Sequence, residues 1–171
     1  DNGLSMWVAD MDFRAPKIIQ EKLHGINSHG IYGYYGDYKE YNNSIKWWMK
    51  NRHNWEIDIS WIFTTHGLVN GTGLCIDAFT KPGDGIILFT PVYYQFSNLV
   101  EAARRQVVEC PLKLIDNHYH FDFVEYERNL SGDEKMVILC SPHNPGGRVW
   151  TKNELQEVAK FAKKHNLVLV S

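Results

Sequence analysis

An asparagine held between two prolines is the strongest chemical signal in this sequence. Asn144 lies between Pro142 and Pro145, in a loop that directly follows the apolar stretch Lys135–Leu139. Each proline fixes its own φ angle and keeps the preceding residue out of the helical region, so a stiff backbone holds the Asn144 amide. In an open α/β sheet, ligands bind where such a loop follows a strand. We expect Asn144 to hydrogen-bond a bound cofactor; the alternative is a plain turn of Asn, Pro and Gly.

A second candidate lies in the segment His66–Val69, between an apolar stretch and a predicted helix. Gly67 allows a close turn of the backbone, and the N–H groups of Leu68 and Val69 would point out of the helix N-terminus. This geometry binds phosphate through main-chain donors and the helix dipole. Many strand-to-helix turns contain glycine, so an ordinary turn is the alternative.

Tyr93 is a third candidate, because the segment Thr90–Phe96 follows the next predicted strand. An aromatic side chain just beyond the carboxyl end of a strand can lie flat against a planar heteroaromatic ring. The alternative is that Tyr93 and Tyr94 only pack at the start of a helix.

The scaffold for these residues is predicted by the alternation of short apolar stretches with longer amphipathic ones. This pattern predicts a parallel sheet covered on both faces, a three-layer α/β/α sandwich. A hairpin turn is expected at Asp116-Asn117-His118. The expected strands are Trp61–Thr64, Gly85–Thr90, Gln106–Glu109, Met136–Cys140 and Leu167–Ser171. The expected helices are Pro16–Leu23, Tyr38–Arg52, Gly67–Thr80, Tyr93–Ala103, Phe123–Asn129 and Thr151–His165.

The loop around Asn144 resembles the Asn-Pro-x-Gly-Arg motif of fold-type I pyridoxal phosphate enzymes, in the aminotransferase class I/II superfamily. The longer run Ser-Pro-His-Asn-Pro-Gly-Gly-Arg-Val-Trp, which ends at Trp150, is similar to the cystathionine β-lyase and cystalysin branch of C–S lyases. The resemblance implies the cofactor pyridoxal 5'-phosphate, with Asn144 on the phenolic oxygen of its ring. It also implies that Tyr93 stacks on the pyridine ring. The phosphate would be held by the turn of Gly67, Leu68 and Val69.

Two N-terminal segments extend the resemblance. His29–Tyr34 resembles a Gly-x-x-Gly-Tyr segment whose tyrosine reaches a neighbouring subunit's cofactor phosphate. This implies a homodimer and a cofactor-binding role for Tyr34, with Tyr32 as the alternative. Met6–Phe13 matches the family's Trp-Val-Ala-Asp-Met-Asp-Phe segment, which implies that Ala9 helps to hold the substrate carboxylate.

The resemblance also predicts how the chain is divided. Residues 1–37 would form an N-terminal extended segment and interface loop, and residues 38–171 part of the large pyridoxal phosphate-binding domain. No lysine follows a predicted strand where a Schiff base could form, so this chain offers no catalytic residue. The chain also stops within the strand-like Leu167–Ser171. We therefore expect an N-terminal fragment, inactive alone, of a longer enzyme.

That longer enzyme is expected to be a C–S β-lyase of amino-acid metabolism. It would release thiol, pyruvate and ammonia from a small sulfur-containing amino acid such as cystathionine or cysteine. The nearest alternative is an aminotransferase, and one from another class is a non-catalytic α/β binding module. A nicotinamide-binding domain is disfavoured, because Gly71-Thr72-Gly73 falls inside a predicted helix rather than in a turn.

Composition excludes several other classes. The 171 residues carry a formal net charge of −2, which gives no electrostatic case for nucleic acid or an anionic membrane. Apolar runs such as Gly85–Phe89 are too short to span a bilayer. The three cysteines are widely spaced, which favours the cytoplasm, and we expect Cys140 to be a buried structural thiol. His118 and His120 indicate a solvated hairpin rather than a metal site.

Overall fold

The computed structural model describes residues 3–4, 7–34 and 36–171. These residues divide into two compact units, Asp1–Ile62 and Phe63–Ser171. Met6, from the N-terminal motif, lies outside the described residues. The boundary expected after residue 37 concerns the domains of a longer enzyme and stays a prediction.

The first unit contains the helices α1 (Lys17–His29) and α2 (Lys39–His53) and the short 3₁₀ helix η1 (Ile59–Trp61). Every residue of α1 and α2 is described, and none of them is buried. The apolar side chains of Tyr41 and Trp48, which were expected to be core, are about half exposed. Within this unit, the other elements, α1 and η1, offer too little apolar surface to cover these two side chains.

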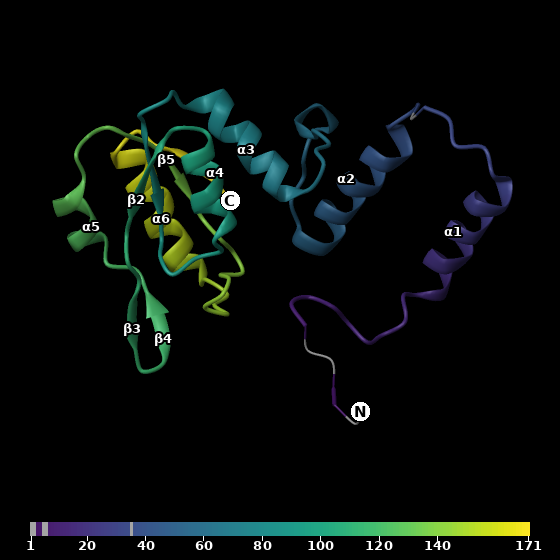
Figure 1. Ribbon diagram of the computed structural model, residues 1–171, viewed down its shortest axis with the longest axis horizontal. Helices are drawn as coiled ribbons and strands as arrows, with labels where there is room; N and C mark the ends of the chain where they lie inside the picture. Colours follow the sequence, from purple (N-terminus) through teal and green to yellow (C-terminus); the bar gives the residue numbers. More distant parts are fainter. Residues whose placement is uncertain (1–2, 5–6, 35) are drawn as a thin grey trace. The chain divides into compact units, whose positions relative to one another are not determined.

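A parallel four-stranded sheet forms the centre of the second unit, as predicted (Figure 1). Its strands stand in the order β2 (Gln106–Glu109), β1 (Gly85–Leu88), β5 (Glu134–Ile138) and β6 (Val168–Val170). All three strand pairs are parallel. Parallel strands require crossovers, and helices supply them.

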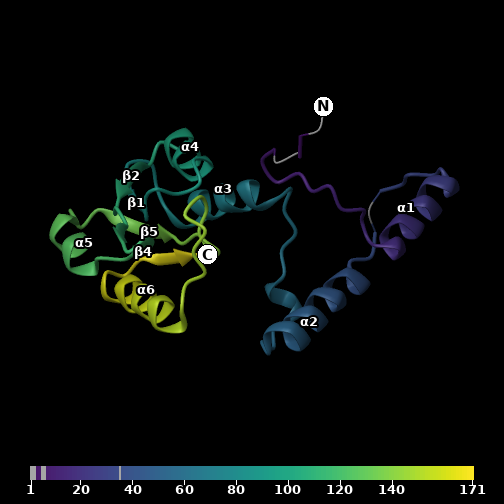
Figure 2. The same ribbon diagram turned by 90° about the horizontal axis from the view of Figure 1, so that it is seen from below.

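Helices cover both faces of this sheet, which confirms the predicted three layers (Figure 2). On one face, Ile76 of α3 (Leu68–Phe79) and Val100 of α4 (Gln95–Ala102) pack with Ile86 of β1. On the other face, α5 (Phe123–Asn129) and α6 (Lys152–Lys164) pack on Ile87. Successive strand residues point to opposite faces, which is why Ile86 and Ile87 belong to different clusters.

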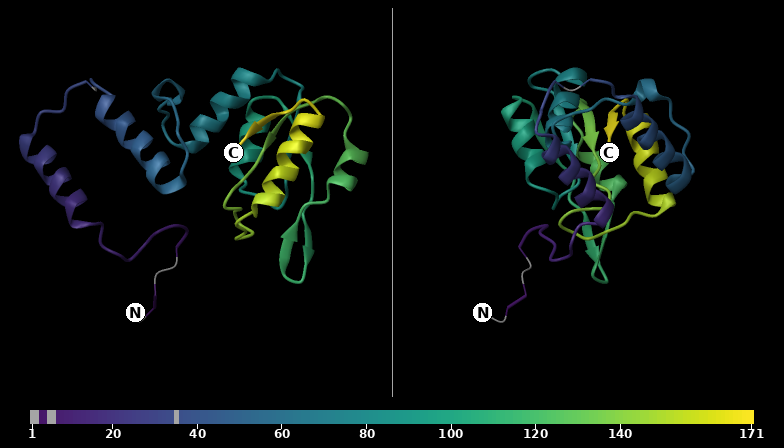
Figure 3. Two further views of the ribbon diagram at one scale, coloured as in Figure 1. Left: turned by 180° about the vertical axis from the view of Figure 1, so that it is seen from behind. Right: turned by 90° about the vertical axis from the view of Figure 1, so that its right-hand side faces the viewer.

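The predicted hairpin is present and projects from the sheet (Figure 3). It joins β3 (Lys113–Ile115) to β4 (His118–His120). Asp116 and Asn117 form its turn, with φ of 49° and 61°. Both values are those of a two-residue turn that matches the twist of the strands. His118, which was expected in the turn, is the first residue of β4.

The strand expected at Trp61–Thr64 is wrong. Trp61 ends η1, where the Asp58 carboxylate accepts a hydrogen bond from the main chain of Ser60. The residues that follow form no strand in the described part of the chain. A short apolar run does not by itself specify a strand, because a strand also needs a partner. Among the described residues, no helix is both long and apolar enough to cross a membrane.

Candidate functional site

A cavity of about 340 Å³ lies at the carboxyl edge of the sheet in the second unit. Four of the six residues expected to bind cofactor line it together: Leu68, Val69, Tyr93 and Asn144. They come from the loops that follow β1 and β5 and from the start of α3. Three separate segments of sequence therefore meet at one small hollow.

The start of α3 presents main-chain donors to this cavity. Gly67 precedes the helix with φ of 88°, a conformation that side chains disfavour, and no side chain caps the helix. The amides of Leu68 and Val69 therefore have no partner within the helix. The Asn70 side chain accepts a hydrogen bond from the His66 amide at 3.3 Å, which holds the turn in place. Asn70 therefore has a local role in the turn before α3.

Tyr93 lies half-buried in the loop between β1 and α4. Its ring meets Tyr94 and Phe96 edge-on, with ring centroids 5.1 and 5.7 Å apart. α4 was expected to start at Tyr93 but starts at Gln95, so Tyr93 belongs to the loop rather than to the helix. Tyr94 is 63% exposed and does not line the cavity.

Asn144 lies in a loop that several contacts hold closed. The Asn144 main-chain N–H donates to the Cys140 sulfur at 3.4 Å, and the Trp150 indole donates to the Cys140 carbonyl at 2.9 Å. Main-chain hydrogen bonds join His143 to Arg148 and Gly147, each at 2.7 Å. The Asn144 side-chain amide makes no hydrogen bond within the described part of the chain. It is free to bind a ligand.

Arg148, the last residue of the Asn-Pro-x-Gly-Arg motif, anchors the far side of the loop. It pairs with Glu154 and donates to the Tyr119 carbonyl at 3.0 Å. Its guanidinium lies 4.8 Å from the centre of the Trp150 ring. Burial raises the pKa of Glu154, but hydrogen bonds from Thr151 and the charge of Arg148 lower it by more. The pKa of Glu154 is therefore below its usual value. Glu154 therefore remains a carboxylate partner for Arg148.

Several lining residues were not expected from the sequence. Thr72, Phe96 and Ser141 also line the cavity. Thr72 could have been found, because it lies one helical turn after Leu68 and so shares its face. Cys140 was expected to be a buried thiol, but it is partly exposed and lines the cavity. The chain has left β5 at Ile138, so the sheet no longer covers Cys140.

The two remaining predicted site residues lie in the first unit. Tyr34 and Ala9 are both exposed. Their roles at a dimer interface and at a substrate carboxylate stay predictions.

The chemistry of this lining is that of a binding site. It offers main-chain N–H groups at a helix start, an aromatic ring and a carboxamide, which suit a flat molecule with an anionic group. In the described part of the chain, the lining includes no lysine, histidine or carboxylate. No cluster of three or more metal-ligating side chains occurs among the described residues.

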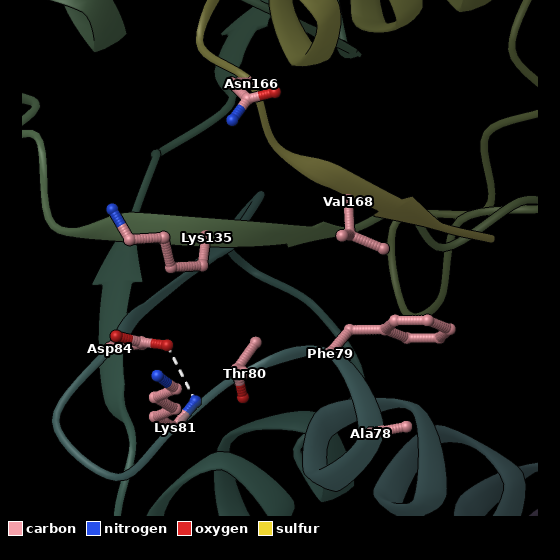
Figure 4. A pocket seen from close by; sticks show the side chains of 8 residues that line it. All are labelled: Ala78, Phe79, Thr80, Lys81, Asp84, Lys135, Asn166 and Val168. Atoms are coloured by element: carbon pink, nitrogen blue, oxygen red, sulfur yellow. Dashed lines mark hydrogen bonds between the residues drawn. The ribbon is translucent and has the colours of Figure 1, made fainter.

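A larger hollow of about 540 Å³ lies at the opposite edge of the sheet, near the amino ends of the strands (Figure 4). There the Asp84 carboxylate accepts from the Lys81 amide at 2.7 Å, and the Lys135 ammonium bonds the Gly132 carbonyl. These polar groups satisfy their own turns and do not converge on a ligand. Because ligands of open α/β sheets bind at the carboxyl edge, the smaller cavity is the candidate site.

Comparison with known proteins agrees with this geometry. The chain is 38% identical to the cystathionine beta-lyase PatB of Bacillus subtilis, over 99% of this chain and 44% of that protein. Cystalysin from Treponema denticola, whose crystal structure contains pyridoxal 5'-phosphate, is 41% identical with a TM-score of 0.88. The match covers 95% of this chain and 41% of cystalysin.

An aminotransferase is also among the similar structures. A PLP-bound putative aminotransferase from Clostridium difficile is 40% identical with a TM-score of 0.90, over 96% of this chain and 42% of that one. The chain thus spans less than half the length of these relatives. The model of the family described as aminotransferase class I and II matches residues 8–171. The chain therefore belongs to the aminotransferase class I and II family and has the fold of its pyridoxal phosphate enzymes.

Proposed function

We propose that the complete protein is a pyridoxal phosphate-dependent C–S β-lyase and that this chain supplies part of its cofactor site. The observation that carries the proposal is the convergence of Leu68, Val69, Tyr93 and Asn144 on one cavity. Two of the named relatives, a cystathionine beta-lyase and cystalysin, support the lyase assignment.

The residues at the cavity fit this cofactor. The amides of Leu68 and Val69, at the positive end of the α3 dipole, would bind its phosphate. Tyr93 would lie against the pyridine ring, and the Asn144 amide would donate to the phenolic oxygen. About 340 Å³ is within the range of small-molecule sites. Pyridoxal phosphate, when bound, serves as an electron sink for carbanion chemistry at an amino acid.

The proton-transferring group would come from elsewhere in the protein. In the described part of the chain, no lysine, histidine, aspartate or glutamate side chain lines the cavity. We therefore propose that a Schiff-base lysine lies outside residues 1–171. On this proposal the isolated chain catalyses no β-elimination.

Aminotransferase activity is the second candidate, and one observation favours it. The putative aminotransferase from Clostridium difficile is about as similar to this chain as cystalysin is. A lyase and an aminotransferase need the same cofactor contacts, so the cavity does not separate them. The substrate proposed for the lyase is a small amino acid with a sulfur leaving group, such as cystathionine or cysteine.

The proposed assembly is a homodimer in the cytoplasm. Tyr34 is fully exposed, as a residue that reaches a second subunit would be in an isolated chain. Cys75, Cys110 and Cys140 are all free thiols, which suits a reducing compartment. Light scattering on the complete protein tests the dimer, and a monomer would remove Tyr34 from the proposed site.

The decisive experiment incubates the complete protein with pyridoxal phosphate and either cystathionine or cysteine. The lyase proposal expects thiol, pyruvate and ammonia in equal amounts without an added keto acid. Amino transfer that depends on a keto acid would establish the aminotransferase instead. Failure of the complete protein to bind the cofactor would leave the non-catalytic module. The matched control is residues 1–171 alone, which should release no pyruvate.

A further inference from the structure

His143 makes a hydrogen bond between two loops of the candidate site. Its ring Nε2 lies 2.7 Å from the main-chain carbonyl oxygen of Pro91, 52 positions earlier in the sequence. The residue is only 2% exposed. Because a carbonyl oxygen can only accept, Nε2 carries the hydrogen and donates it. The other ring nitrogen, Nδ1, is buried without a hydrogen-bond partner in the described part of the chain.

The two ends of this hydrogen bond adjoin the two side chains proposed to hold the cofactor ring. His143 directly precedes Asn144, and Pro91 precedes Tyr93 with one residue between them. Within the described residues, it is the only hydrogen bond between the loops 90–94 and 141–149. It therefore joins the main chain beside Asn144 to the main chain near Tyr93.

Several further contacts hold His143 in place within its own loop. Its main-chain N–H donates to Arg148 and its carbonyl accepts from Gly147, each at 2.7 Å. Its ring packs edge-on against Trp150, with centroids 5.3 Å apart. A Cβ on Gly146 would come within 2.9 Å of the ring, so the main chain of the loop also lies against it.

We propose that His143 is a positioning residue that sets the spacing between Asn144 and Tyr93 for the cofactor ring. The proposal rests on the proposed function, because it assigns Asn144 and Tyr93 to the same ligand. His143 itself does not line the cavity, so it acts through its neighbour rather than by touching the ligand. The geometry of the ring suits this role, since its Nε2 donates across to the other loop while the ring packs against Trp150.

Three substitutions separate the hydrogen bond from the volume of the ring. In His143→Gln the amide nitrogen can take the place of Nε2 and donate to Pro91. In His143→Asn the side chain is too short to reach, although it is equally polar. His143→Phe fills the space but has no donor. The comparison of Gln with Asn holds even if the Phe variant fails to fold.

The measurement is the dissociation constant of pyridoxal phosphate from the complete protein. Quenching of tryptophan fluorescence reports the binding. Loss of one hydrogen bond predicts about tenfold weaker binding in H143N and H143F. H143Q should stay within about threefold of wild type. In an Asn144→Ala background, H143N should add less than about twofold, because its effect passes through Asn144.

Three results would overturn the proposal. H143N and H143F could bind the cofactor as tightly as wild type while unfolding more easily, which would make His143 merely structural. H143N could weaken binding equally with and without Asn144, which would show that it does not act through that residue. If wild type binds no pyridoxal phosphate, the proposed function fails and this inference fails with it.

Discussion

The indole N–H of Trp150 donates to the main-chain carbonyl of Cys140 at 2.9 Å and so ties together the two ends of the loop that carries Asn144. Trp150 is 4% exposed and packs on Phe121, with ring centroids 4.2 Å apart. The loop is therefore anchored in the hydrophobic core on the α6 face of the sheet. These contacts offset part of the conformational entropy that is lost when the loop is ordered.

Replacing Trp150 by Phe should lower the free energy of unfolding by about 1–3 kcal/mol, because it removes a hydrogen bond and leaves a small void. Urea denaturation followed by circular dichroism measures this change. Trp55, which is 56% exposed, provides the matched control. Trp55→Phe should change the unfolding free energy by less than about 0.5 kcal/mol. Equal effects of the two substitutions would contradict the anchoring role of Trp150.

Gly146 tests how tightly the same loop is packed. A Cβ at Gly146 would lie 2.8 Å from the Tyr119 ring and 2.9 Å from the His143 ring. Gly146→Ala should therefore destabilise the protein by about 1–3 kcal/mol. Gly25, inside α1, has nothing within 4 Å of an added Cβ, so Gly25→Ala should be neutral or slightly stabilising. Thermal unfolding compares the two, and an unchanged melting temperature for G146A would show that the loop yields.

The fold was largely predictable because its strands and helices differ in length and periodicity. The strand Gln106–Glu109 and the helix Phe123–Asn129 were predicted at their observed bounds. The prediction failed at Trp61–Thr64, where a local hydrogen bond to Asp58 forms a 3₁₀ turn instead. Sequence periodicity does not report whether a short apolar run finds a partner strand, because pairing depends on the rest of the fold.

The candidate site was predictable where the ligand contacts come from loops at strand ends. The loops of Tyr93 and Asn144 follow the parallel strands β1 and β5, and parallel strands bring such loops to one edge. The turn at Gly67 was indicated by its motif, although no strand precedes it in the described part of the chain. The hydrogen bond from His143 to Pro91 could not be predicted, because it joins residues 52 positions apart. The exposure of Cys140 was missed for a related reason, since β5 ends earlier than its apolar pattern indicated.

Glu134 predicts how stability depends on pH. Burial raises the pKa of Glu134. The carboxylate also accepts hydrogen bonds from the main chain of Ser131 and Gly132 and from the Ser131 hydroxyl, and these lower the pKa by more than burial raises it. The folded pKa is therefore below the unfolded value of about 4.3. Such a carboxylate stabilises the fold above that value, and its contribution is lost as the pH falls through the folded pKa.

Glu134→Gln should therefore unfold more easily than wild type at neutral pH. The difference in unfolding free energy should shrink as the pH falls below about 4.3 and through the folded pKa, because protonated Glu134 is neutral, as glutamine is. Urea titrations at several pH values give this difference directly. Glu101 on α4 is exposed, and Glu101→Gln serves as the control without such a pH trend. A constant difference between E134Q and wild type across this range would refute the assignment.

The three cysteines should differ in their reactivity toward alkylating reagents. Burial, with a smaller effect from the charge of Glu134, raises the pKa of the Cys110 thiol to about 12, and this residue is 3% exposed. Cys140 is partly exposed and lines the candidate cavity. At mildly alkaline pH, mass spectrometry of the complete folded protein should therefore find Cys140 labelled and Cys110 unlabelled, because only an accessible thiolate reacts.

Pyridoxal phosphate should slow the labelling of Cys140 but not of Cys75, which lies on α3 outside the cavity lining. Equal labelling of Cys140 with and without the cofactor would place the cofactor elsewhere, and labelling of Cys110 before unfolding would contradict the packing of the core.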